Sequence, residues 1–174
     1  MMQRKKDQND QNEDELEVWN LFGPTHTPYR VLFLGKMLDR LTTSQVKSLA
    51  DLTLAEWRVL AHLGVMGKKS ASDICSAAMM DRAEVSRSVS RLAERGLLKR
   101  SPNPRNKKSQ LLSLTAKGTK VYVDVQKHRL GFFGYVTQDL SKKELAQLDE
   151  FLLRIAKRTT RLEHTQARLD DFIK

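Results

Sequence analysis

The chain has 174 residues and a mass of 20.0 kDa, which predicts one domain, with or without an appendage, whose core needs neither disulfides nor a structural metal. Its single cysteine, Cys75, excludes an internal disulfide and any zinc site built from several cysteines, and no apolar run approaches the roughly 18 residues that span a bilayer. Because the N-terminus also lacks the apolar core of a secretory signal, we expect a cytoplasmic protein that does not enter a membrane.

The positive charge of the chain is concentrated in one region. Lys and Arg number 31 against 21 Asp and Glu, which gives a formal net charge of +10. The region from Asp81 to Gln110 alone holds nine basic and three acidic side chains. A local excess of this kind favours a polyanionic partner, either nucleic acid or an anionic membrane surface.

The first fifty residues predict a polar tail and a long helix. Residues 1–15 are almost wholly polar and are predicted to be disordered, because they cannot bury enough apolar area to offset the entropy of ordering. Residues 16–50 contain a long helix that begins at Pro28, since proline is tolerated in the first helical turn. Its apolar side chains recur at helical spacing: Val31, Leu34, Leu38 and Leu41, with Phe33 and Met37 widening the stripe.

Residues 51–115 predict three shorter helices. The first starts at the capping box Thr53–Glu56 and is expected to stop at Gly64 and Gly67. The next two are expected over Ser70–Ala77 and Asp81–Arg95. About three residues join this last pair, as a helix-turn-helix requires.

A basic β-hairpin is predicted to follow these helices. Two short apolar runs, Leu97–Ser101 and Gln110–Leu114, have the character of strands. The segment Pro102–Lys108 between them supplies two prolines, two asparagines and three cations, which indicates an exposed turn. The middle of the chain therefore resembles a helix-turn-helix with a wing.

Residues 116–174 return to helical spacing, and the capping box Ser141–Glu144 starts a last helix with the apolar series Leu145, Leu148, Leu152, Ile155 and Leu162. The outer helices carry more apolar surface than one small winged domain can cover, so we expect a second copy to cover it. The predicted fold is mostly α with a small β-hairpin wing: a winged helix-turn-helix core flanked by long N- and C-terminal dimerisation helices.

The helix over Asp81–Arg95 is the strongest candidate for contact with DNA. With Val85, Val89 and Leu92 inward, the other side carries Arg82, Ser86, Arg87, Ser90 and Arg91. Arginine can hydrogen-bond guanine through two donors, which discriminates bases by about 1–3 kcal/mol. A solvated face with Glu–Arg pairs is the alternative, but the preceding helix and the basic hairpin favour DNA. The hairpin tip carries the cations Arg105, Lys107 and Lys108. They could serve only to keep an exposed turn soluble, but we favour binding in a minor groove or along phosphates.

The sequence gives little support for an enzyme, because it lacks the residue patterns of a metal, phosphate-binding or thiol site. The histidines His26, His62, His128 and His164 lie on separate segments without metal-ligand spacing. The run Gly64–Ser70 fails as a phosphate-binding loop, because it lacks the upstream glycine and the hydroxyl residue after the lysine. Cys75 has no partner cysteine and is expected to be a small buried hydrophobe. We therefore expect no catalytic residues, no metal and no cofactor.

Four runs of the sequence resemble the MarR family of bacterial transcription regulators: Leu52–Leu60, Val85–Leu92, Arg95–Arg100 and Leu112–Gly118. The resemblance covers about Pro28 to Leu162. It implies a winged helix-turn-helix in an obligate homodimer whose terminal helices interleave. It also implies binding to pseudo-palindromic operators, often relieved by small aromatic or phenolic acids.

The resemblance also assigns roles to residues. It places Arg87 in the major groove, flanked on the same face by Ala83, Ser86 and Ser90. Where the family's wing has Asp-x-Arg, this chain has Asn106-Lys107-Lys108, so we expect Lys108 to add phosphate affinity and less sequence discrimination. The first long helix has no cysteine near its start, and thiol sensing is therefore not expected.

The resulting hypothesis is a homodimeric repressor that binds double-stranded DNA and is released by a small aromatic or acidic ligand. The ligand would lie between the dimer helices and the winged domain, and residues that could line its pocket, or could equally be plain core, are Tyr29, Phe33, Met37, Trp57, His128 and Phe132. The alternative function is a protein-interaction or architectural module with only non-specific DNA affinity. Salt dependence together with preference over random DNA distinguishes the two.

Overall fold

The computed structural model describes Trp19, Gly23 and residues 26–165, the last three of them as backbone only. The tail predicted to be disordered, residues 1–15, lies outside this part of the chain. The protein divides into two compact units, one up to Val125 and one from Gln126 onward. The domain boundaries expected at residues 16, 51 and 116 stay predictions.

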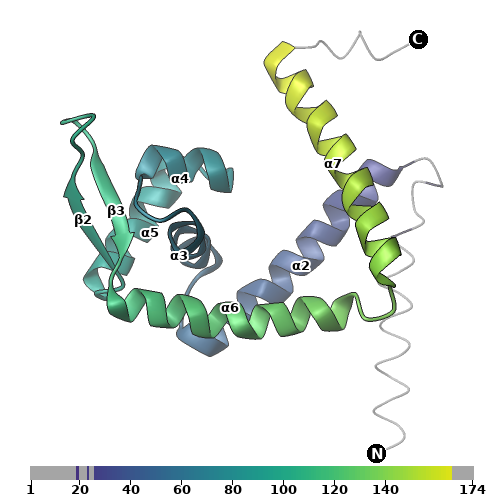
Figure 1. Ribbon diagram of the computed structural model, residues 1–174, viewed down its shortest axis with the longest axis horizontal. Coiled ribbons are helices and arrows are strands. Elements are labelled where there is room, and N and C mark those ends of the chain that lie inside the picture. The colour runs from purple at the N-terminus through teal and green to yellow at the C-terminus, as the bar shows by residue number, and fades with distance from the viewer. Residues whose placement is uncertain (1–18, 20–22, 24–25, 166–174) are drawn as a thin grey trace, which may run out of the picture. The chain divides into compact units, whose positions relative to one another are not determined.

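The order of the elements agrees with the sequence-based expectation (Figure 1). The long helix α2 (Thr27–Ala50) comes before the helices and strands of the winged core. These are α3 (Leu54–Met66), β1 (Lys69–Ser70), α4 (Ala71–Ala78), α5 (Arg82–Glu94), β2 (Leu98–Pro102) and β3 (Gln110–Leu114). Two long helices end the described chain: α6 (Ala116–Val136) and α7 (Lys142–Thr165). The fold is therefore mostly helical with a small sheet, as predicted.

The predicted starts of α3, α4 and α7 are confirmed by capping hydrogen bonds. At α3, the Glu56 amide donates to Thr53 Oγ1 (3.2 Å) and the Thr53 amide donates to Glu56 Oε2 (2.8 Å). The same reciprocal pair joins Ser70 to Asp73 at α4 and recurs at the start of α7. The Ser70 amide and hydroxyl both donate to Asp73, and these bonds hold the pKa of its carboxyl below the usual value.

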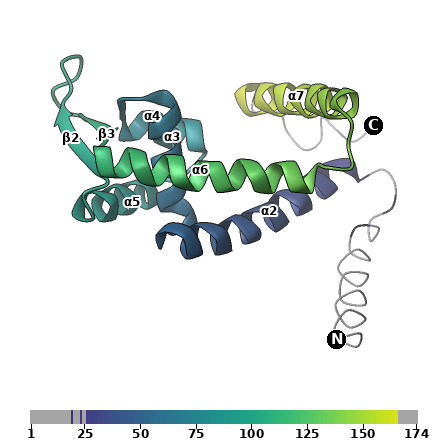
Figure 2. The ribbon, with the colours of Figure 1, turned by 60° about the horizontal axis from the view of Figure 1, so that its bottom comes forward.

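The sheet is antiparallel, with strand order β1-β3-β2. Strands β2 and β3 pair from Leu98 opposite Leu114 to Pro102 opposite Gln110, so β2 begins one residue later than expected. The two-residue strand β1, absent from the expected elements, pairs Lys69 with Leu112. Figures 1 and 2 show the β2–β3 hairpin, hereafter the wing, extending beyond the helices of the core.

The hydrophobic core lies within the winged part of the first unit. Its largest fully buried side chains come from helices α2 to α6 and from the segments that precede α3 and β2: Leu52, Leu60, Ile74, Leu92, Leu97, Val46, Val59, Val85 and Val125. The first turns of α6 close this core, because Tyr122 is buried and its ring stacks on that of Trp57 at a centroid distance of 6.2 Å. Side chains of α5 and of the wing strands thus pack in the same core, which fixes the two elements to each other.

The expectation that Gly64 stops α3 is wrong. The helix continues to Met66 and ends at Gly67, whose φ of 69° is in the left-handed region. Gly64 lies inside the helix because its lack of a side chain admits the Tyr122 ring, whose atoms would lie 2.7 Å from an added Cβ. Here glycine serves packing between α3 and α6 rather than helix termination.

The long helices leave many large apolar side chains exposed. In α7, Leu148, Phe151, Leu152 and Ile155 form a stripe at helical spacing and are 38–45% exposed. Others lie on α2 and on the C-terminal half of α6: Val31, Leu32, Leu34, Leu41, Leu130, Phe133, Tyr135 and Val136. In the described part of the chain, no helix has both the length and the apolarity to cross a membrane.

Candidate nucleic-acid interface

Helix α5 is built to present one polar face. Asp81 caps its N-terminus by accepting a hydrogen bond of 2.7 Å from the Glu84 amide. The buried face consists of Val85, Ser88, Val89 and Leu92. The opposite face is exposed at Arg82, Ala83, Ser86, Arg87 and Arg91, whereas Ser90 is half-buried. The side chains predicted for base and phosphate contact therefore lie away from the core, with Ser90 at the edge of the face.

Helix α4 and the turn after it place α5 at this surface. Residue Met79 caps α4 in the left-handed conformation, with φ 51° and ψ 45°. The Met80 amide then donates to the Cys75 carbonyl (3.1 Å), and the Met80 side chain is buried. This turn joins two short helices, as the predicted helix-turn-helix requires.

Two asparagines order the tip of the wing. The Arg105 amide donates to Asn103 Oδ1 and the Lys108 amide donates to Asn106 Oδ1, each at 3.0 Å. Asn103 Nδ2 also donates to Ser109 Oγ across the turn (2.8 Å). These side chain-to-backbone bonds hold the turn without an ion pair. The side chains of Arg105, Lys107 and Lys108 are all exposed.

A hollow of about 510 Å³ lies between α5 and the wing. Its walls come from the start of α4 (Ser70, Ala71 and Ser72), from α5 (Ser86 and Val89) and from the wing (Arg100, Lys107, Lys108, Ser109, Gln110 and Leu112). Two of the predicted wing cations therefore share one concave surface with a predicted residue of α5. Arg105 is not among the residues that line it.

Arg100 is a member of this surface that the sequence analysis does not single out. Its Nη2 donates to Ser90 Oγ (3.3 Å), so the arginine links β2 to α5 and lines the hollow. The pairing of Arg100 with Leu112 in the β2–β3 ladder fixes its place. The only signal in the sequence is its position in the basic stretch from Asp81 to Gln110, which does not separate it from Lys99.

We expect Arg100→Gln to weaken binding to all duplex sequences by a similar factor. The neutral side chain keeps a hydrogen-bond donor for Ser90 but loses the charge that attracts phosphates. The slope of log affinity against log salt should fall by about one unit. Fluorescence anisotropy across a salt series measures this slope, and an unchanged slope would mean that Arg100 only braces the wing.

Arg91 forms an ion pair within the protein and is also exposed to solvent. Its Nη1 lies 3.9 Å from Glu56 Oε1, and its side chain remains 60% exposed. This position allows the guanidinium to approach a phosphate from one side while the carboxylate balances its charge on the other.

The six residues predicted to line a ligand pocket belong to both units. Tyr29 and Phe33 stack on each other along α2, with ring centroids 6.4 Å apart, and Met37 is half-buried on the same helix. Trp57 is buried in the winged core. His128 and Phe132 belong to the second unit. Their assignment as a pocket stays a prediction.

Within the described residues, no three or more His, Cys, Asp or Glu side chains are grouped so as to hold a metal ion. Cys75, expected to be a small buried hydrophobe, is half-buried on α4 and packs against the hydrophobic core. The chemistry that this region offers is a basic concave surface beside an exposed helix face.

Comparison with known proteins gives this surface a context. A sequence model described as "MarR family" matches residues 50–109, which span the helix-turn-helix, strand β2 and the turn of the wing. Over 139 residues the chain is 25% identical to the transcriptional activatory protein BadR of Rhodopseudomonas palustris, covering 78% of this chain and 79% of BadR.

Solved structures show the same fold. A mutant MarR from E. coli, complexed with operator DNA, matches with a TM-score of 0.64 and 23% identity over 72% of this chain and 89% of that one. The PcaV transcriptional regulator from Streptomyces coelicolor, in complex with its natural ligand, matches with a TM-score of 0.62 and 22% identity over 76% and 93% of the two chains.

Proposed function

The chain belongs to the MarR family of DNA-binding transcription regulators, and from this we propose that it binds a pseudo-palindromic operator as a homodimer and represses transcription in the cytoplasm. The observation that carries the proposal is the shared hollow, because α5 and the wing both contribute to it. A duplex that meets Ser86 of α5 also meets Lys107 and Lys108 of the wing. Base edges and backbone would then be contacted together.

The proposed DNA contacts divide by chemistry. Arg87, with Ala83, Ser86 and Ser90 around it, is assigned to base edges in the major groove, because arginine can meet guanine through two donors. The other cations that the sequence predicts at the interface are assigned to phosphates and the minor groove: Arg82, Arg91, Arg105, Lys107 and Lys108. The net charge of +10 supports the same assignment, since it attracts the duplex before specific contacts form.

The homodimer is supported by the exposed apolar stripe of α7 and by the apolar side chains of α2 and α6. A single subunit leaves these side chains in water, and a second copy would cover them. Two recognition helices about 34 Å apart would reach successive major grooves on one side of the duplex. A dimer bound at its operator would repress by occupying that stretch of DNA.

Release by a small aromatic or acidic ligand completes the proposal. It is supported by the structural likeness to PcaV, which was solved with its natural ligand, and by the half-buried side chains of Tyr29, Phe33 and Met37 on α2. A ligand that prefers dimers with the wrong helix spacing would lower operator affinity. Titration of the protein–DNA complex with aromatic acids tests this, and Phe33→Ala should raise the concentration needed for release.

Arg87→Ala and Lys108→Ala should have different effects on DNA binding. Loss of Arg87 should cost about 1–3 kcal/mol with the preferred duplex and relax base preference at one position of each half-site. Loss of Lys108 should weaken binding to all sequences alike and reduce the salt slope by about one unit. Selection from randomised duplexes, followed by anisotropy titrations, measures both quantities.

The outcome separates the proposal from the architectural alternative. A regulator retains a large preference for its selected duplex at every salt concentration, whereas a non-specific module loses affinity for all duplexes together. If Arg87→Ala bound the selected duplex like the wild type, the assigned orientation of α5 would be wrong. A promoter–reporter assay with the selected site then gives the sign of regulation.

A further inference from the structure

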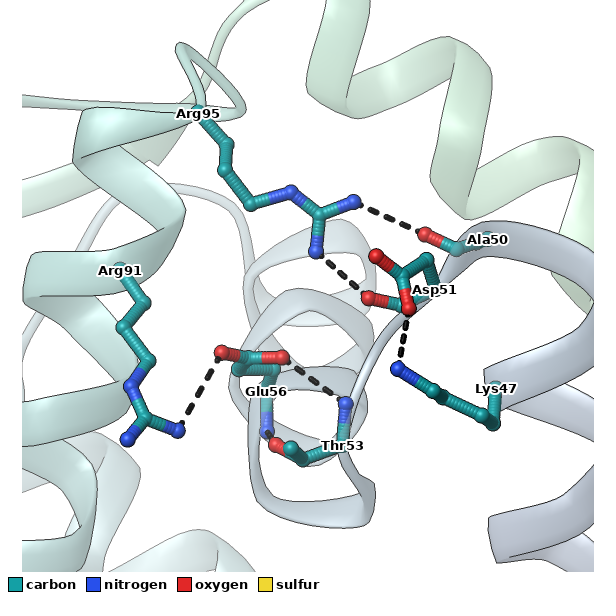
Figure 3. A network of polar contacts seen from close by, with 7 residues as sticks. All are labelled: Lys47, Ala50, Asp51, Thr53, Glu56, Arg91 and Arg95. Atoms are coloured by element: carbon teal, nitrogen blue, oxygen red, sulfur yellow. Dashed lines mark hydrogen bonds and ion pairs between the residues drawn. The ribbon is translucent and has the colours of Figure 1, made fainter.

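Arg91 of α5 and Arg95, which caps the C-terminus of α5, contact the two sides of the turn that joins α2 to α3 (Figure 3). Arg95, at the C-terminal cap of α5, donates from Nη2 to the Ala50 carbonyl (2.9 Å) and from Nη1 to the Asp51 carbonyl (2.8 Å). One helical turn earlier, Arg91 lies beside Glu56 at the start of α3. Because residues four apart share a helix face, one edge of α5 contacts both sides of this turn.

The Arg95 contacts satisfy groups that the end of a helix leaves open. Ala50 is the last residue of α2, and carbonyls in the last turn of a helix lack intrahelical donors and carry partial negative charge. The guanidinium supplies two donors and a positive charge at this point. Arg95 thus binds the C-terminal end of α2. This helix belongs to the N-terminal segment that is expected to form the dimer.

The turn itself is held in one conformation. Asp51 has left-handed backbone angles, φ 52° and ψ 43°, which residues other than glycine seldom adopt. Its carboxylate is hydrogen-bonded to Lys47, and this contact holds the pKa of Asp51 below its usual value. On the other side of the turn, Glu56 is 5% exposed and bonds the Thr53 amide through Oε2 while Oε1 faces Arg91. A buried carboxylate of this kind is costly without partners, so the arrangement resists change.

From these contacts we infer that Arg95 is a positioning residue for operator binding: it fixes recognition helix α5 to the end of α2 and thereby sets the separation of the two recognition helices in the dimer. The inference rests on the proposed function, since a separation exists only between two subunits. Arg95 itself is assigned no contact with DNA. Its effect passes through α2, which the dimer would hold at a set distance from its counterpart.

A positioning role predicts a different result from a structural role. If Arg95 only stabilised the winged core, its loss would lower the melting temperature and weaken binding to every duplex by one factor. If Arg95 sets the helix separation, its loss reduces the preference of the protein for one spacing of half-sites over the others. One base pair shifts a half-site by about 3.4 Å along the duplex, so spacing is a fine measure of helix separation.

The test uses the full chain and a duplex that the wild-type protein selects from randomised double-stranded DNA. Two further duplexes carry one base pair more or one fewer at the centre of that site. We expect the wild type to bind the selected duplex at least about tenfold more tightly than either altered duplex, and Arg95→Gln to reduce this ratio to about threefold or less. Arg95→Lys, which keeps the charge and can bond one of the two carbonyls, should give an intermediate ratio.

Arg105→Gln is the matched control, because it removes a guanidinium from the wing tip and not from the α2 contact. It should weaken binding to all three duplexes equally and leave the ratio at its wild-type value. An unchanged ratio in Arg95→Gln would overturn the inference and leave the proposed function standing. A wild-type protein with equal affinity for the three duplexes would overturn both. If Arg95→Gln failed to fold, the ratio of Arg95→Lys would decide: a reduced ratio supports the inference and a wild-type ratio overturns it.

Discussion

Replacing Leu148 and Leu152 together by glutamate is expected to convert the protein to single subunits and to lower its affinity for the selected operator by about 100-fold or more. Both leucines belong to the exposed apolar stripe of α7, one turn apart. In a subunit interface each glutamate would bury a charge without a partner. A single winged domain would then hold one half-site and lose the gain from binding both halves at once.

The matched control places the same charges on the other side of the helix. Ala146 and Leu153 are exposed residues of α7 that lie off the stripe, and their double replacement by glutamate should leave the dimer and its operator affinity intact. Sedimentation equilibrium gives the mass of each variant, and anisotropy gives its affinity. A variant with Leu148 and Leu152 replaced that still sedimented as a dimer would place the interface elsewhere than on this stripe.

Features set by residues near one another in sequence could be predicted without the structure. The capping boxes at Thr53, Ser70 and Ser141 each need only two residues three positions apart, and all three are present. The apolar stripe of α7 follows from helical periodicity in the same way. The exposed face of α5 was also predictable, because its buried side repeats with the helical period.

Features that depend on distant parts of the chain could not be found in this way. Gly64 has the sequence character of a helix stop, yet the Tyr122 ring, 58 positions away, makes it a packing site inside α3. Arg95 and Arg100 look alike in the basic stretch, but one contacts α2 and the other Ser90. Strand β1 is too short for any periodic signal and exists because β3 offers it an edge. In each case the deciding partner is a residue that local spacing cannot identify.

Gly118→Ala is expected to lower the free energy of unfolding by about 3 kcal/mol, the upper part of the range for inserting a methyl group where none fits. An added Cβ at Gly118 would lie 1.8 Å from the carbonyl oxygen of Leu97, which is backbone and cannot rotate away. The same carbonyl accepts the Thr115 amide (3.1 Å), and Thr115 Oγ1 accepts the Gly118 amide (3.0 Å). Relief of the clash would therefore disturb the start of α6 and the segment leading into β2 together.

The control for this prediction lies in the same helix. Gly131 of α6 has no atom within 4 Å of an added Cβ, so Gly131→Ala should be neutral or raise the free energy of unfolding by about 0.5–1 kcal/mol through helix propensity. Urea denaturation followed by circular dichroism measures both changes. If Gly118→Ala unfolded at the wild-type urea concentration, the close approach of α6 to Leu97 would be disproved, and with it the account of how the wing is fixed to the helices that carry it.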